Sequence, residues 1–245
     1  MDIATPPRGI AALVDFFTRL FSVGAKASFS ETAASLAPAV AAEPVPETSP
    51  APIAAPAPAA PVRADPLTAR VVANLACEEG IVPEAYRDTG GVWTWDLGQA
   101  ETGGFDVQRY KDNPQSLDTC LREGIEAIRE RYLPAVLAAF GDRTLTESQL
   151  AAALSFHWNT GAIHTADWIG DVLGGRNDAA RASILNWSSH GVLIARRIRE
   201  RDLFFDGKWR TSFAAPVWSV AKPSYHPAGA HPVDVLPLLQ QILGA

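Results

Sequence analysis

The sequence predicts an α+β fold that is mainly helical, with a small β-hairpin lobe beside its first helix and a disordered Ala/Pro-rich tether before it. Three observations lead to this prediction. Apolar residues recur at helical spacing over 66–79 and over most of 115–204. A short alternating segment, 92–97, follows a Gly-Gly turn. Alanine and proline dominate residues 41–65, so this stretch has too few large apolar side chains to form a core.

The chain divides into three parts by composition. Residues 1–40 contain an amphipathic segment at 9–23, residues 41–65 form a linker, and residues 66–245 form the folded domain. The core of that domain is expected over 66–207, followed by a C-terminal extension. The hydrophobic content of 47% and the seven tryptophans suffice for one buried core, so we expect a single folded domain.

Residues 9–23 are expected to form a short amphipathic helix. Asp15 and Arg19 lie on its polar face. One basic residue on this face is too few for strong binding to a lipid surface. We therefore favour docking, on a virion or other partner protein or on the chain's own domain, over association with a membrane surface. The apolar face consists of Ile10, Leu13, Val14, Phe17, Leu20 and Phe21.

The linker over 41–65 is expected to be extended and polyproline-like, because its composition cannot bury enough apolar surface to fold. At about 3.1 Å per residue it would reach roughly 60 to 80 Å. It would therefore act as a tether between the N-terminal segment and the folded domain.

The first helix of the folded domain is expected over 66–79. Asp65 is suited to cap it and Pro66 to occupy its first position. Gly80 and Pro83 are expected to end it.

The strand expected over 92–97 begins after Gly90-Gly91. Side chains alternate along a strand, so Thr94 and Asp96 share one face with Val92. The opposite face carries Trp93, Trp95 and Leu97.

The remainder of the domain is expected to be helical, with glycine, asparagine and proline separating the helices. The tail after Trp209 is rich in proline and histidine, and its only expected element is a terminal helix over Val233–Leu243. The other helices are expected at 115–132, 134–140, 146–158, 165–173, 177–187 and 191–204.

Charge and hydropathy exclude several classes of protein. The net charge of −6 argues against a nucleic-acid binder, which would carry a basic patch. No run reaches the roughly 18 to 20 apolar residues of a membrane-spanning helix. Asp15 and Arg19 interrupt the apolar N-terminal stretch, so a secretory signal is not expected.

Neither a metal nor another cofactor is expected. Cys77 and Cys120 lie in helix-like segments and are interpreted as free thiols, with a single bridge between them as the alternative. The five histidines do not have the spacing of a zinc site, and no glycine-rich phosphate loop is present.

Two carboxylates and a hydroxyl gather around the predicted hairpin. Glu79 closes the first helix, Asp88 follows nine residues later, and Thr94 lies on the strand. Hydrolysis of a glycosidic bond needs one group to protonate the leaving oxygen and another to manage a water. Glu79 at a helix C-terminus is suited to be the acid, because the helix dipole and burial both raise a carboxyl pKa. The alternatives are Glu78 as a rival acid and Asp88 as an Asx-turn residue.

These residues resemble the phage-type lysozymes, the muramidases and endolysins of glycoside hydrolase family 24. That family carries Glu-Gly, an aspartate nine residues after the glutamate and a threonine six residues later, as do Glu79-Gly80, Asp88 and Thr94. Residues 145–161 resemble the family's central helix and residues 191–204 its C-terminal Gly-Leu-x-x-Arg-Arg-x-x-Glu helix. The resemblance covers roughly residues 66 to 207 and implies a lysozyme-like fold.

The resemblance implies a peptidoglycan hydrolase without a cofactor. Its substrate would be the β-1,4 bond between N-acetylmuramic acid and N-acetylglucosamine. Glu79 would protonate the leaving oxygen, and Asp88 and Thr94 would place the water, with inversion at the sugar carbon. A lytic transglycosylase, which needs only the glutamate, stays open as an alternative reaction.

Two positions depart from the family's strand pattern. Asp96 stands where the family has glycine, and Gln99 stands where it has histidine. Asp96 is expected on the cleft face as a substrate-binding residue, where a second carboxylate would raise neighbouring carboxyl pKa values. It would tune Asp88, take over its role or partly block the site. These departures favour a second hypothesis, a non-catalytic component of a phage or phage-like particle that binds peptidoglycan.

Trp158 and Asn159 are weaker candidates for substrate binding, because the family's central helix borders the sugar cleft there. The alternative for Trp158 is core packing. Arg196 and Arg197 are interpreted as helix-surface partners of Glu200 and not as catalytic residues. We expect a monomer that is phage- or prophage-encoded, located in the host cytoplasm or on a particle, and active in the periplasm or cell wall.

Overall fold

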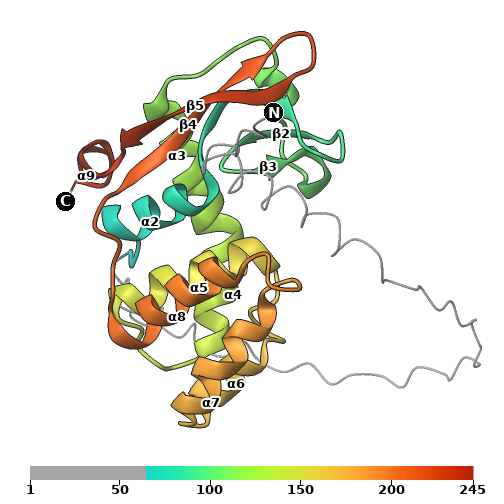
Figure 1. The fold of residues 1–245 in the computed structure, drawn as a ribbon. Helices are drawn as coiled ribbons and strands as arrows, with labels where there is room; N and C mark the ends of the chain where they lie inside the picture. Colours follow the sequence, from blue (N-terminus) through green and yellow to red (C-terminus); the bar gives the residue numbers. More distant parts are fainter. Residues whose placement is uncertain (1–64, 245) are drawn as a thin grey trace, which may run out of the picture.

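The computed structural model describes residues 65–244, which form an α+β fold dominated by helices (Figure 1). This is the fold class that the sequence predicts. The expectations for segment 9–23 and for the linker up to residue 64 lie outside the described residues.

The first described helix, α2 (Ala69–Glu79), begins later than predicted. Thr68 caps it, since its side-chain oxygen accepts from the Val71 N–H at 3.2 Å. Asp65 instead accepts from the backbone N–H of Leu67 at 3.0 Å, so its assignment as the cap was wrong. The helix ends at Gly80 as predicted, with a φ of 76° that favours glycine.

The β lobe is an antiparallel sheet of three strands in the order β1-β2-β3. The strands are β1 (Val82–Arg87), β2 (Trp93–Asp96) and β3 (Gln99–Ala100). β2 confirms the predicted strand. The sequence predicts a hairpin lobe without giving bounds for β1, which contains Pro83 and pairs with β2 irregularly between Val82 and Tyr86.

The six helical segments predicted after the lobe are all present, with shifted bounds. A short π-helical stretch, Ile128–Tyr132, joins two helices that run almost end to end. Two single 3₁₀ turns, Glu101–Gly103 and Gln108–Tyr110, precede them, and a third, Ile184–Trp187, follows α7. The helices are α3 (Leu117–Ala127), α4 (Leu133–Phe140), α5 (Glu147–Thr160), α6 (Asp167–Leu173), α7 (Asn177–Ser183) and α8 (Ile194–Asp206).

The tail differs from the prediction. It forms an antiparallel ribbon of β4 (Ala214–Ala221) and β5 (His226–Asp234), followed by α9 (Leu236–Leu243). The predicted start of the terminal helix at Val233 was therefore wrong. β5 carries two prolines and a glycine, which are poor strand formers, so its extended form depends on pairing with β4.

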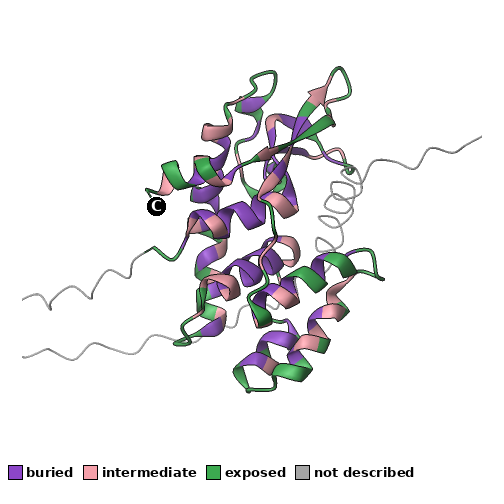
Figure 2. Cartoon of the chain, turned by 60° about the vertical axis from the view of Figure 1, so that its left-hand side comes forward, coloured by how far each residue is buried: buried purple, intermediate pink, exposed green. Residues whose placement is uncertain are grey.

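The core lies where α2 and α5 meet the surrounding helices. Every residue of α5 from Leu150 to Trp158 is buried, which leaves this helix without a solvent-facing side over that span. Figure 2 shows buried residues on the inner sides of the helices and exposed residues at the loops and outer faces. Within residues 65–244, no helix is both long and apolar enough to cross a membrane.

Candidate active site

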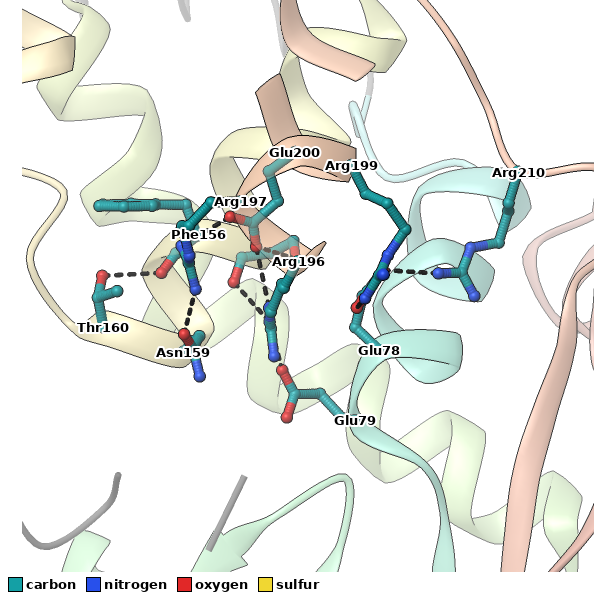
Figure 3. A network of polar contacts seen from close by, with 11 residues as sticks. Glu78, Glu79, Phe156, Asn159, Thr160, Arg196, Arg197, Arg199, Glu200 and Arg210 are labelled. Atoms are coloured by element: carbon teal, nitrogen blue, oxygen red, sulfur yellow. Dashed lines mark hydrogen bonds and ion pairs between the residues drawn. The ribbon is translucent and has the colours of Figure 1, made fainter. Parts of the chain in front are cut away.

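Glu79 lies at the last position of α2, and its side chain is completely buried. Its Oε1 accepts from Arg196 Nη2 at 2.6 Å (Figure 3). Its Oε2 has no hydrogen-bond partner among the described residues. One oxygen is thus fixed by a cation, and the other can interact with a further group.

Burial raises the pKa of Glu79, because the charged form loses its hydration. Arg196 acts in the opposite direction, while the nearby carboxylates of Glu78 and Glu200 raise the pKa further. The net effect is a raised pKa, so the Glu79 carboxyl keeps its proton at pH values where an ordinary glutamate is ionised.

Arg196 is held in place by a second carboxylate and by α5. Its Nε donates to Glu200 Oε1 at 3.0 Å, and its Nη2 donates to the Ser155 carbonyl at 2.8 Å. The Ser155 hydroxyl donates to the same Glu200 oxygen at 2.7 Å. Glu79 and Glu200 together raise the pKa of Arg196 against the effect of burial, so the guanidinium stays charged.

The interpretation of Arg196 and Arg197 as helix-surface residues was wrong. Their exposed fractions are 5% and 0%, because α8 packs along α5. Their pairing with Glu200 is present, with Arg197 Nη1 2.6 Å from Glu200 Oε2. The contact of Arg196 with Glu79 was missed, since the two residues are 117 positions apart and no sequence pattern joins them.

Glu78, the rival acid, points away from Glu79 (Figure 3). Arg199 donates to both of its oxygens, at 2.8 and 2.7 Å, and Arg210 Nη2 donates to Oε1 at 2.6 Å. Burial opposes ionisation of Glu78, but these guanidinium groups and Arg196 outweigh it and lower its pKa to about 2. Glu78 is therefore ionised at neutral pH.

Asp88 lies directly after β1 and organises the turn that follows. Its Oδ1 accepts from the backbone N–H groups of Gly90 at 2.9 Å and Val92 at 2.8 Å. The Asx-turn alternative therefore describes one of its oxygens correctly. Its Oδ2 is buried and has no hydrogen-bond partner among residues 65–244.

Burial also raises the pKa of Asp88. The N–H groups of Val92, Gly90 and Gly91 oppose this effect, as does the Thr94 hydroxyl. Thr94 is fully buried in β2, and its hydroxyl donates to the Val92 carbonyl at 3.3 Å. Thr94 thus lies beside the Asp88 turn, as its position in the sequence suggests.

Tyr86 is a site residue that sequence reasoning missed. It is 1% exposed and pairs with Thr94 across β1 and β2. Burial raises its phenol pKa well above the usual value, and the carboxylates of Asp88, Asp96 and Glu79 add to this effect. The phenol is therefore within electrostatic reach of all three carboxylates. The sequence does offer one sign of this proximity, because Tyr86 lies two residues before Asp88 and side chains two apart in an extended segment share a face.

Asp96 is buried against α3 rather than open to solvent. Its backbone φ of 51° ends the strand alternation, and a Cβ on Gly124 would lie 3.1 Å from Asp96 Oδ2. Both carboxylate oxygens lack hydrogen-bond partners among the described residues. Burial holds the pKa of Asp96 well above its usual range, and Glu123 raises it further. Gln99, the second departure, is buried in β3 opposite Trp95.

Trp158 and Asn159 are both engaged with other side chains. The Trp158 ring is 8% exposed and stacks on Tyr132, with centroids 4.1 Å apart. Asn159 Oδ1 accepts from Arg197 Nη2. Tyr132 is only half-buried, and Glu79 contributes to raising its pKa, second to burial. Tyr132 is therefore the more accessible aromatic side chain near the buried glutamate.

Metal-ligand geometry and the state of the cysteines can be read from the described part of the chain. It contains no group of three or more histidine, cysteine, aspartate or glutamate side chains arranged to hold a metal ion. Cys77 and Cys120 are free thiols, in agreement with the favoured interpretation.

Comparison with known families places the chain among the lysozyme-type glycoside hydrolases. Residues 76–200, about half of the chain, match the family model described as phage lysozyme. The chain belongs to this family, and its class is that of a muramidase-type peptidoglycan hydrolase. A comparison with curated proteins finds no match.

Several solved structures are similar to this chain. An endolysin from Escherichia coli O157:H7 phage FAHEc1 is 20% identical, with a TM-score of 0.49, covering 58% of this chain and 94% of its own. A P22 lysozyme mutant is 23% identical, with a TM-score of 0.46, covering 55% and 94%. The muramidase domain of SpmX from Asticaccaulis excentricus is 24% identical, with a TM-score of 0.43, covering 56% and 95%.

Proposed function

We propose that the protein cleaves the β-1,4 bond between N-acetylmuramic acid and N-acetylglucosamine in peptidoglycan, with Glu79 as the general acid. The observation that carries this proposal is the environment of Glu79. Its side chain is fully buried, one oxygen is paired with Arg196, and the other oxygen lacks a partner among the described residues. A carboxyl of raised pKa can carry a proton at the pH where it must donate one.

Asp88 and Thr94 place the attacking water in this proposal. The turn N–H groups hold Asp88 Oδ1, which leaves Oδ2 to accept a hydrogen bond from a water. Thr94 lies beside that carboxylate, and its hydroxyl offers the water a second hydrogen-bond partner. A water held on the opposite side of the bond from the acid leads to inversion.

Asp96, Trp158 and Asn159 have a smaller part in the proposed function than Glu79, Asp88 and Thr94. Asp96 packs against α3 and Trp158 against Tyr132, so we assign them supporting roles. Asn159 is half-buried and accepts from Arg197 through Oδ1, which leaves its amide N–H groups to contact substrate. Residues 66–245 are proposed as the catalytic domain of a monomer that is phage- or prophage-encoded. The protein would start in the host cytoplasm or on a particle and act on the wall.

A second candidate function rests on Asp96. Asp96 stands where the family has glycine, its two carboxylate oxygens have no hydrogen-bond partner among the described residues, and it acts on the same Tyr86 phenol as Glu79 and Asp88 do. In this case the protein would bind peptidoglycan as a structural component without cutting it.

The two functions are separated by cleavage of purified murein with wild-type protein and Glu79→Gln. The matched control is Glu78→Gln, which makes the same chemical change one residue earlier on a side chain paired with Arg199 and Arg210. We expect loss of at least about 100-fold in Glu79→Gln, because general acid catalysis contributes about that much, and retained cleavage in folded Glu78→Gln. Equal activity of wild type and Glu79→Gln would refute the assignment of the acid.

A further inference from the structure

The C-terminal ribbon of β4 and β5 lies outside residues 76–200, the span that matches the phage lysozyme family. It nevertheless packs on α2 and on β1 of the β lobe, and in Figure 1 the ribbon lies above α2. Near its start, the Ile81 N–H donates to the Pro216 carbonyl and the Trp218 N–H donates to the Ile81 carbonyl, both at 2.8 Å. The ribbon thereby extends the lobe on the side of β1.

The tip of the ribbon contacts the residue immediately before Asp88. The Arg87 N–H donates to the Tyr225 carbonyl at 2.7 Å, and His226 Nδ1 lies 2.9 Å from the Arg87 carbonyl. Since a carbonyl can only accept, His226 donates from Nδ1. Both main-chain polar groups of Arg87 are therefore bonded to the ribbon.

The tip also contacts the residue that follows the turn. The Tyr225 ring packs edge-on against Trp93, with centroids 5.1 Å apart. The Arg87 guanidinium lies 4.5 Å from the centre of the Trp93 ring, and its Nη1 donates to the Gly91 carbonyl at 2.6 Å. Both ends of the turn that carries Asp88 are thus held by two adjacent ribbon residues.

The tip is itself anchored to the lobe. The Tyr225 hydroxyl donates to Asp112, with its oxygens at 3.0 and 2.9 Å, and Lys222 pairs with both Asp112 and Glu84. Tyr225 adopts a φ of 59°, a conformation that bulky residues rarely take. Such a conformation persists only where the surroundings enforce it, and here the bonds to Arg87 and Asp112 do so.

We propose that the ribbon is a clamp that positions the Asp88 turn, with His226 and Tyr225 as positioning residues for the water-placing carboxylate. This inference rests on the proposed function, since Asp88 must hold a water for its position to matter. Asp88 Oδ1 is fixed by the turn itself, so the placement of Oδ2 depends on where the turn lies relative to Glu79. The ribbon fixes the two ends of that turn.

The test compares His226→Ala with His231→Ala. Both histidines are exposed and lie on β5, but His231 pairs with Val217, far along the strand from the tip. His226→Asn serves as a rescue variant, because its amide can donate from close to the position of Nδ1. The readouts are kcat and KM on purified murein and hydrogen exchange of the peptide over 86–95.

We expect His226→Ala to lower kcat about ten-fold with little change in KM, since a small misplacement of a catalytic group costs up to about 100-fold. Exchange should quicken over 86–95 and stay unchanged in α5. His226→Asn should recover most of kcat, and His231→Ala should match wild type. Unchanged kcat in His226→Ala would overturn the clamp, as would an equal loss of exchange protection throughout the domain.

The same measurements distinguish failure of the clamp from failure of the proposed function. If wild-type protein releases no products from murein, the proposed function fails and exchange alone decides the clamp. Faster exchange confined to 86–95 in His226→Ala then supports the clamp, and unchanged exchange overturns it.

Discussion

Replacing Arg196 by methionine should destabilise the protein strongly and in a pH-dependent way. Arg196 pairs with two buried carboxylates, at 2.6 Å from Glu79 and 3.0 Å from Glu200, and also donates to the Ser155 carbonyl. The substitution keeps the volume of the side chain but leaves both carboxylates without that partner. Breaking a buried ion pair on one side costs about 3 to 5 kcal/mol, which we expect for the free energy of unfolding near pH 7.

The pH dependence follows from the direction of the Glu79 pKa. A carboxyl whose pKa is raised in the folded state binds its proton more tightly there, so stability falls as the pH rises from the unfolded toward the folded pKa. Arg196 lowers the pKa of Glu79 in the wild type, against burial. Without Arg196 the folded pKa rises further, so the destabilisation should be larger near pH 7 than near pH 4.5, which is close to a typical unfolded glutamate pKa of about 4.3.

The assay is urea unfolding at both pH values, followed by tryptophan fluorescence. Arg122→Met is the matched control, because Arg122 pairs with Asp118 on the surface, where both side chains are about half exposed. It should change stability little at either pH. A destabilisation by Arg196→Met that is no larger near pH 7 than near pH 4.5 would show that Arg196 does not lower the pKa of Glu79.

Three further predictions follow from the site. Asp88→Asn should fold normally, since its side-chain oxygen can still accept from Gly90 and Val92, but it should lower kcat on murein about 100-fold or more. Thermal melting checks the folding and a kinetic assay checks kcat. An unimpaired kcat would remove Asp88 from the mechanism. As the pH rises, kcat/KM should fall with a pKa above about 4.3, the usual value of a glutamate, because burial raises the pKa of the proton donor Glu79. A fall with a pKa at or below that value would contradict this assignment. Trp158→Ala should cost about 3 to 5 kcal/mol of stability in urea unfolding, because the ring is buried and stacked on Tyr132, whereas a loss of substrate affinity without destabilisation would restore its role as a binding residue.

Helices and the central strand of the domain were predictable because their signals are local. The capping box at Thr146 and Gln149 marks the start of α5, and Gly80 marks the end of α2. The ribbon was not predictable, because β5 has few residues that favour a strand and becomes extended only by pairing with β4. β1 was likewise hard to predict, because it contains Pro83 and proline is a poor strand former.

The candidate residues that belong to one short motif could be predicted from the sequence, and the residues that contact them from distant parts of the chain could not. Glu79, Asp88 and Thr94 lie within one helix-turn-strand unit, so their spacing carries their relation. Arg196 reaches Glu79 from α8, and only the packing of α8 on α5 brings it there. Asp96 was expected to share the open face of Thr94, but its positive φ turns the strand and its side chain lies against α3.

In the proposed reaction Glu79 donates a proton while Asp88 and Thr94 place a water. The decisive measurement is mass spectrometry of the products that wild-type protein releases from purified murein in oxygen-18 water. We expect reducing ends that carry the label, because the attacking water supplies the new oxygen. Anhydro products would contradict the role of Asp88 and Thr94, and binding to murein without any product would contradict the assignment of an enzyme.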